Sequence, residues 1–122
     1  MKSFLVAYII FLLMIGSIVG NARYIDTTVD ELLEMLGTAD PSDTAQNAQR
    51  LRELEAFWNK EKKFVQVSVS HHKVDAVRDL LSSLLIYNEC GDLTEYEKTA
   101  ALLSAAIEEL RLPEKLSGEN IF

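Results

Sequence analysis

The sequence predicts an all-α protein, in which an N-terminal transmembrane helix is followed by a small antiparallel helical bundle of about three to four helices. Three observations predict this fold class. Residues 4–20 form an uncharged apolar run. Residues 23–112 contain several segments in which apolar side chains recur at helical spacing. Capping residues and Gly or Pro breaks leave only short connections between these segments, which makes consecutive helices antiparallel neighbours.

The apolar run at residues 4–20 is predicted to be a signal anchor within residues 1–22. As a helix its 17 residues reach about 25 Å, slightly less than a hydrocarbon core of about 30 Å. Lys2 precedes the run, so the positive-inside rule predicts a single-pass protein of the cell membrane with a cytoplasmic N-terminus and an extracytoplasmic C-terminal domain.

Two alternatives to a membrane anchor stay open. One is a cleaved signal peptide with residues 20–22 as the cleavage site, although the run is longer than a usual h-region. The other is a buried core helix, which is disfavoured because so small a domain would struggle to cover a helix that is apolar on every side.

The predicted bundle, residues 23–112, begins with one apolar helical face between residues 25 and 36, which ends at Gly37. A capping-box pattern at residues 28–31 would let a new helix start there. The alternative is a helix that continues unbroken from the membrane.

A second helix is predicted to start near Pro41 or Ser42, with Asp40 as its N-cap, and to continue through Lys63. Its apolar face consists of Ala48, Leu51, Leu54 and Trp58. Residues 65–69 alternate strictly, which is typical of a strand. A helix is preferred there, because an isolated strand would leave its backbone unpaired.

Ser70 and Gly91 are expected to bound a third helix as its N-cap and C′ residue. Asp92 then caps a fourth helix, which ends at Leu112–Pro113 and has nearly three heptads of apolar residues, as in a coiled coil. Those apolar residues are Leu93, Tyr96, Ala100, Leu103, Ile107 and Leu110. Residues 113–122 form a C-terminal tail.

The charged side chains are divided unevenly between the two parts. Residues 1–22 contain one lysine and no acid, whereas the other 100 residues contain 11 basic and 19 acidic side chains and have a net charge of −8. This acidity argues against nucleic-acid binding, because phosphates need a clustered positive field. It also predicts no attraction to anionic lipid headgroups.

The turn at His71 and His72 is the one candidate for a metal site. Each histidine lies three or four residues before Asp75, so on a helix each could face a cation together with that carboxylate. Zn²⁺ normally takes at least three protein ligands, and no third ligand stands at a fixed spacing. A solvated helix start explains these residues better, and neither a metal site nor a cofactor is predicted.

No catalytic residue is predicted, and the chain is not expected to be an enzyme. Cys90 is the single cysteine, which excludes an intrachain disulfide and leaves it without a nearby cysteine partner. No serine stands in a G-x-S-x-G context, and the five glycines are isolated, so no phosphate-binding loop is present in the sequence.

Two pairs of apolar residues are candidates for contact with a partner. Trp58 with Phe57 could anchor an interface, although in so small a domain such residues more often belong to the core. Ile121 with Phe122 could enter a groove that captures a C-terminus, or could pack back onto the bundle.

The order of these features resembles a family of Gram-positive (Firmicutes) proteins called domain of unknown function 4363. The resemblance rests on four segments that follow the N-terminal anchor: TTVDELL at 27–33, FWNKEKK at 57–63, SHHKVD at 70–75 and LSGENIF at 116–122. It implies a membrane-anchored helical protein and supplies no activity.

These observations predict a non-enzymatic, membrane-anchored, extracytoplasmic helical module that acts through interaction or as an accessory protein. Residues 4–20 would bind the membrane, a membrane protein is a possible partner, and a homo-oligomer is compatible with the bundle pattern. The alternative function is a small extracytoplasmic sensor of a metal, a ligand or pH that uses the His71–His72 turn.

Overall fold

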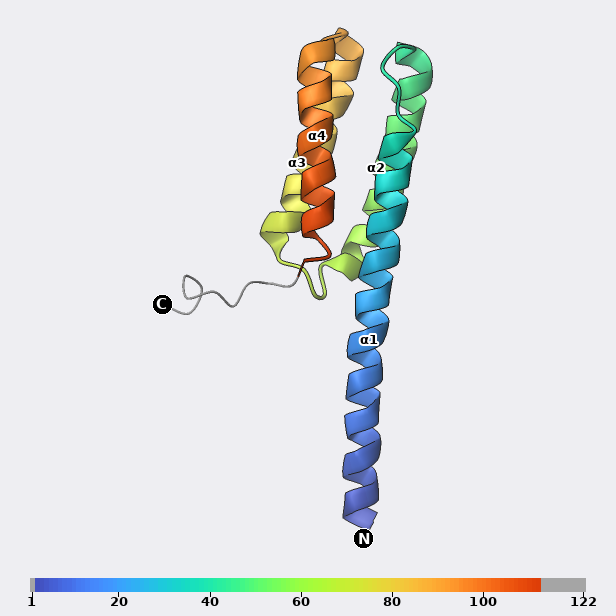
Figure 1. Cartoon of the computed structure of the whole chain (residues 1–122), viewed down its shortest axis with the longest axis vertical. Coiled ribbons are helices and arrows are strands. Elements are labelled where there is room, and N and C mark those ends of the chain that lie inside the picture. The colour runs from blue at the N-terminus through green and yellow to red at the C-terminus, as the bar shows by residue number, and fades with distance from the viewer. Residues whose placement is uncertain (1, 113–122) are drawn as a thin grey trace, which may run out of the picture.

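The computed structural model describes residues 2–112, and this part of the chain consists of four α-helices with no strand (Figure 1). The helices are α1 (Lys2–Gly37), α2 (Thr44–Val65), α3 (His71–Cys90) and α4 (Leu93–Glu109). The predicted all-α class is therefore confirmed. The predicted C-terminal tail, with Ile121 and Phe122, lies outside the described residues.

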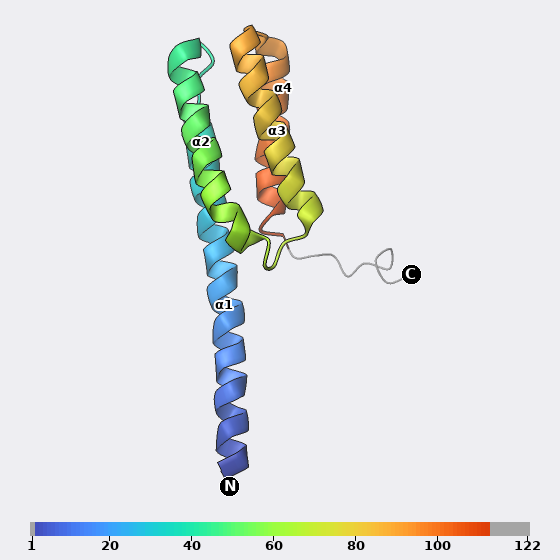
Figure 2. The same cartoon turned by 180° about the vertical axis from the view of Figure 1, so that it is seen from behind.

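The second half of α1 forms an up-down-up-down bundle with the other three helices, as Figures 1 and 2 show from opposite sides. Helix α1 packs against α2 and α4, and α3 packs against the same two helices. Each helix is antiparallel to the next, because the connections between them are short. The first half of α1 extends beyond the bundle as a single helix.

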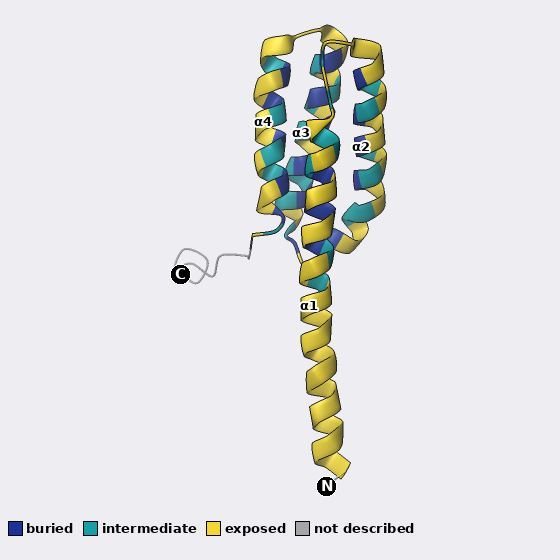
Figure 3. Cartoon of the chain, turned by 45° about the vertical axis from the view of Figure 1, so that its right-hand side comes forward, coloured by how far each residue is buried: buried dark blue, intermediate teal, exposed yellow. Residues whose placement is uncertain are grey.

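Helix α1 runs unbroken over 36 residues, or about 54 Å, so the helix does not restart at residues 28–31. Its first buried residue is Ile25, and Thr28, Val29 and Leu32 continue the buried face. In Figure 3 the lower half of α1 is exposed throughout. The helix is long and apolar enough to cross a membrane, and none of its most apolar 18-residue window is buried. The core-helix alternative is therefore wrong for this segment.

The core of the bundle is built from the apolar faces that the spacing predicts. Its largest fully buried side chains include Trp58, Leu51, Leu54, Leu81, Leu84, Leu103 and Ile107. One member of the predicted heptads departs from the pattern, because Leu93, the first residue of α4, is exposed. Leu93 directly follows the N-cap Asp92, at the start of the helix.

The start of α2 differs from the prediction. The helix begins at Thr44, and Asp43 is its N-cap, with Oδ1 accepting a hydrogen bond from the Gln46 N–H at 3.2 Å. Asp40 instead accepts a bond from the Ser42 N–H at 3.0 Å and closes a turn before the helix. The predicted start near Pro41 or Ser42, with Asp40 as N-cap, is therefore wrong by about one helical turn.

Residues 65–69 form neither a strand nor a continued helix. Helix α2 ends at Val65, and the Val69 N–H donates to the Val65 carbonyl oxygen at 3.0 Å across a turn. Val65 and Val69 are buried, whereas Val67 between them is 80% exposed. The alternation thus marks a turn with two inward valines, and the helix prediction holds only as far as Val65.

The connection between α3 and α4 agrees with the prediction. Gly91 has a φ of +69°, the left-handed conformation that favours glycine after a helix. The Asp92 carboxylate then caps α4 by accepting a bond from the Glu95 N–H at 3.2 Å.

Candidate functional site

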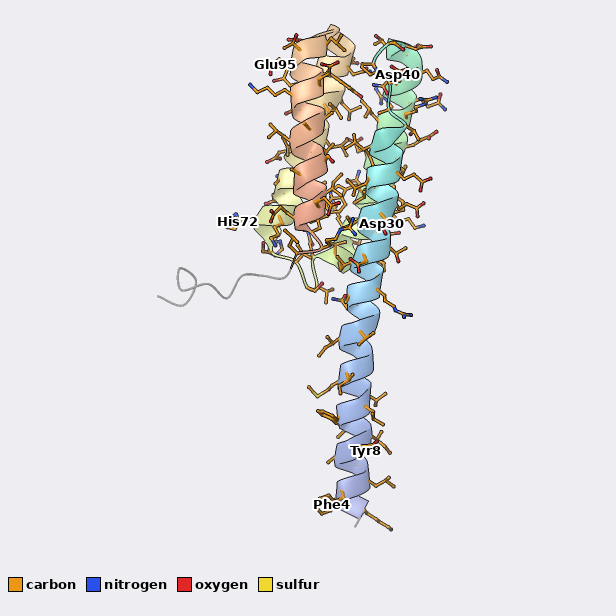
Figure 4. The ribbon with its side chains drawn as sticks, in the orientation of Figure 1. Phe4, Tyr8, Asp30, Asp40, His72 and Glu95 are labelled. Carbon is orange, nitrogen blue, oxygen red and sulfur yellow. The ribbon has the colours of Figure 1, made fainter. Side chains whose placement is uncertain are left out.

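The polar contacts of the bundle gather at its two ends. We call the end from which the apolar half of α1 extends the proximal end, and the opposite end the distal end. Asp40 and Glu95 lie at the distal end, whereas Asp30 and His72 lie toward the proximal end (Figure 4).

A buried hydrogen-bond network centred on Asn47 occupies the distal end. The Asn47 side-chain amide, only 1% exposed, donates from Nδ2 to Asn88 Oδ1 and to the Tyr96 hydroxyl, both at 2.9 Å. Asn47 Oδ1 accepts from the Asp40 N–H at 2.7 Å. Asn88 Nδ2 donates to the Thr44 carbonyl oxygen at 3.1 Å. The network ties α2, α3, α4 and the loop after α1 together.

The space beside this network is too small for a substrate. A cavity of about 30 Å³ lies between the Asn88–Tyr96 pair and the turn at Gly91 and Asp92. That volume holds about one water molecule. Since the amide and hydroxyl groups bond to one another, the network is suited to fixing the helix arrangement rather than to chemistry.

Burial raises the pKa of the Tyr96 phenol above its ordinary value of 10.0, and the charge of Asp40 acts in the same direction, against the hydrogen bond from Asn47. The stability that the neutral phenol contributes is complete below about pH 10 and is lost as pH rises through the raised pKa.

We expect Tyr96→Phe to lower the free energy of unfolding by about 1 kcal/mol at neutral pH, since Asn47 loses one of its acceptors. The variant should also lose less stability than the wild type above about pH 10. Denaturant unfolding of the full chain in mild detergent, followed by circular dichroism, measures both effects. Tyr87→Phe, at a half-buried residue outside the network, is the matched control. An equal alkaline loss in wild type and Tyr96→Phe would contradict the expectation.

A charged cluster around Arg111 lies at the proximal end and joins the end of α4 to α1. Arg111 Nη2 lies 2.9 Å from Asp30 Oδ1, and Nε lies 2.9 Å from Glu108 Oε2. Asp26 Oδ1 is 3.8 Å from Nη1. Burial lowers the pKa of the Arg111 guanidinium, but the bond to Asp30 and the charge of Glu108 outweigh it, so the pKa is raised. Arg111 stays a cation that holds three carboxylates.

Arg111→Gln should lower the free energy of unfolding by about 1 kcal/mol, because its side chain is only 25% exposed and its removal leaves three acids facing one another. The loss should shrink in high salt, which screens that repulsion. The same unfolding measurement, made at low and high salt, checks this. Arg78→Gln is the control, since that side chain is 55% exposed. A loss no larger than the control's would contradict the prediction.

A shallow crevice of about 180 Å³ lies beside this cluster, where α1, the turn before α3 and the end of α4 meet. Its lining residues are Ala22, Ile25, Asp26, Ser68, Val69, Leu110, Arg111 and Leu112. Ligand pockets usually enclose about 300 Å³ or more, so the crevice is small for an organic substrate.

The predicted turn at His71 and His72 is exposed, and His72 projects from the outside of the bundle (Figure 4). Asp75 is paired with Arg78, with 3.5 Å between Oδ1 and Nη1. Across residues 2–112 no group of three or more His, Cys, Asp or Glu side chains is placed to hold a metal ion. No observation favours the sensor alternative.

The model of one protein family, described as Domain of unknown function (DUF4363), matches residues 19–121. The chain belongs to this family. The resemblance that the sequence motifs indicate is therefore confirmed. No curated protein and no solved structure matches the chain.

The DUF4363 match covers the bundle and leaves most of the apolar run outside it. Membership in the family assigns no activity, which agrees with an unknown function.

The four residues predicted as interaction candidates differ in where they lie. Trp58 is 1% exposed and belongs to the core, so a partner could not reach it without opening the bundle. Of the two alternatives for Trp58, this burial favours the core. Phe57 is half-buried and packs against the core from its edge. Ile121 and Phe122 fall in the part of the DUF4363 chain that the structure does not describe.

Sequence reasoning missed both polar clusters. The signal for the distal network was present, because Asn47 lies four residues before Leu51 and Asn88 four residues after Leu84, on the buried faces of their helices. A polar residue at a core position usually has a buried partner. The Arg111 cluster had no such signal, since two of its three partners, Asp26 and Asp30, come from α1, more than 80 residues away.

Proposed function

We propose that this DUF4363 protein is a non-enzymatic accessory module that α1 anchors in the cell membrane, where the bundle contacts another membrane protein. The observation that carries the proposal is the continuity of α1. One helix contains both an apolar half that no described residue covers and a half that forms one side of the bundle core. A helix that is apolar on all sides needs lipid around it.

The charge distribution supports a cytoplasmic N-terminus and an extracytoplasmic bundle. Lys2 lies before the apolar run, and all 19 acids follow it. By the positive-inside rule the lysine stays in the cytoplasm.

The packing just after the run supports an uncleaved anchor over a cleaved signal peptide. Tyr24 donates a hydrogen bond to the Glu61 carboxylate, and its ring meets that of Phe64 edge-on, with 6.2 Å between centroids. These contacts lie two residues after Ala22, the end of the alternative cleavage site, and hold α1 in helical form there. Cleavage after Ala22 would place these contacts at the start of a helix, where helices fray.

Cys90 allows a direct test of topology, because it is exposed at the distal end and is the only cysteine of the chain. A membrane-impermeant maleimide should label it in intact cells, while the protein stays in the membrane after carbonate extraction. In a Cys90→Ser background, Ser3→Cys should be labelled only after the membrane is opened. Release of a form that begins near Arg23 into the medium would contradict the anchor.

The interaction itself is tested by site-specific cross-linking in the native membrane. Exposed apolar residues on the bundle are few, and Ile86 on α3 and Leu102 on α4 are two of them. A photoreactive residue at either position should give a discrete adduct with a membrane protein or with a second copy of the chain. A probe at Leu84, which is buried, is the control. Absence of any adduct from the exposed positions would count against the accessory role.

A further inference from the structure

We propose that the end of α2 and the turn after it form a second membrane contact, which binds a lipid surface containing anionic headgroups. The contact consists of Lys60, Lys63, Phe64 and Val67, which we call the basal stripe. The proposal rests on the membrane insertion of α1 proposed above. It adds that the bundle touches the bilayer that α1 crosses.

The basal stripe lies at the level where α1 leaves the membrane. The apolar run ends at Gly20, and Tyr24 follows about 6 Å further along the helix axis. Phe64 lies against the Tyr24 ring. The neighbouring residues Ser68 and Val69 line the crevice that Ala22 also lines. Figures 1 and 2 show the α2–α3 turn beside α1, at the end of the bundle from which the apolar half of α1 extends.

Lys60, Lys63 and Phe64 lie on one side of α2, because the spacing i, i+3 and i+4 places them in one row along the helix. Val67 follows them in the turn after the helix. All four are exposed, Phe64 at 58% and Val67 at 80%. The packing of the bundle does not explain this exposure, because Val65 and Val69 are the residues that fill the core at this turn. An exposed aromatic and an exposed valine at headgroup level suit insertion into the interface.

Local charge at this turn is opposite to that of the domain. Residues 60–73 contain four lysines and one acid, Glu61, within a part of the chain whose net charge is −8. Glu61 accepts the hydrogen bond from Tyr24. Lys73 donates to the carbonyl oxygens of Glu109 and Leu112 at the end of the bundle, so the proposal relies on Lys60 and Lys63. The low attraction expected from the overall acidity therefore does not apply at this end.

Helix polarity alone does not account for the stripe. Lysines near the C-terminus of α2 also suit the negative end of the helix dipole. That effect explains a charge in the last turn but not the two exposed apolar side chains that follow it. In the basal stripe the apolar side chains would lie closer to the membrane than the lysines. This order matches that of a bilayer, in which the acyl chains lie below the headgroups.

The test uses the full chain with a Cys90→Ser background and a fluorophore on Gln66→Cys, an exposed position in the turn that leaves the stripe intact. The protein is reconstituted into phosphatidylcholine vesicles with or without phosphatidylglycerol. A nitroxide lipid labelled near its headgroup should quench the fluorophore more strongly when phosphatidylglycerol is present. Each lysine near an anionic surface shifts the equilibrium between undocked and docked bundle about fivefold toward the docked form. The double variant Lys60→Gln with Lys63→Gln should therefore lower this docking equilibrium constant by roughly tenfold or more. Val67→Ser should also reduce quenching.

Two controls separate this proposal from the anchor. Lys98→Gln removes an exposed lysine on α4 outside the basal stripe and should change nothing. A fluorophore on Ser17→Cys should be quenched by a nitroxide deep in the acyl chains, with or without phosphatidylglycerol. If Ser17→Cys is quenched but Gln66→Cys is not, the basal contact is overturned and the anchor stands. If Ser17→Cys is not quenched, the anchor fails and this inference with it.

Discussion

Replacing Trp58 with alanine should lower the free energy of unfolding of the bundle by about 4 kcal/mol. The indole is 1% exposed and is one of the largest fully buried side chains of the core. Its removal loses apolar burial and leaves a cavity that the neighbouring helices can only partly fill. Denaturant unfolding of the full chain in mild detergent, followed by circular dichroism, measures the change.

Two further variants show which property of Trp58 matters. Phe57→Ala, at a half-buried neighbour, should cost less than half as much. Within the described residues the Trp58 Nε1–H has no hydrogen-bond partner. Trp58→Phe removes that unsatisfied donor and should therefore cost only about 1 kcal/mol. Unchanged stability of Trp58→Ala, together with loss of a cross-linked partner, would instead place Trp58 in an interface.

Asn47→Ala should cost about 3 kcal/mol, nearly as much as the loss of a large core side chain. The substitution leaves Asn88 Oδ1 and the Asp40 N–H without the partners they have at 2.9 Å and 2.7 Å. Asn88 is only 3% exposed, so without this partner its Oδ1 loses its hydration and gains nothing in return. The measurement is again the free energy of unfolding of the full chain.

Gln46→Ala is the matched control for Asn47→Ala, because Gln46 is the preceding residue on α2 and is exposed. It should change stability by less than about 0.5 kcal/mol. The double variant Asn47→Ala with Asn88→Ala should cost clearly less than the sum of the single variants, since the two amides bond to each other. Additive losses would show that the network does not act as a unit.

The core of this fold could be predicted because it depends on spacing alone. Leu51, Leu54 and Trp58 recur at helical intervals, and nothing but burial explains that interval. The start of α2 could not be predicted in the same way, because Asp40 and Asp43 are both good N-caps three residues apart. A tertiary contact favours Asp43, since the bond between the Asp40 N–H and Asn47 fixes the loop before the helix.

At the proximal end, too, the sequence pattern does not determine which side chains are exposed. The alternation of Val65, Val67 and Val69 contains no information about the turn geometry that buries two valines and exposes the third. The overall charge likewise says nothing about where the lysines gather once α2 runs back toward the membrane. Both facts depend on where α2 ends beside α1, which the folded chain shows.

Because α1 is unbroken, the bundle and the membrane segment would move together as one rigid body. About 25 Å of helix separates Gly20 from Gly37, so in a bilayer a tilt of roughly 10° would displace the distal end sideways by about 4 Å. A flexible linker would absorb such a tilt, whereas a continuous helix transmits it. Bilayer thickness, or a neighbour pressing on the membrane segment, would thereby set the angle at which the distal end meets its surroundings.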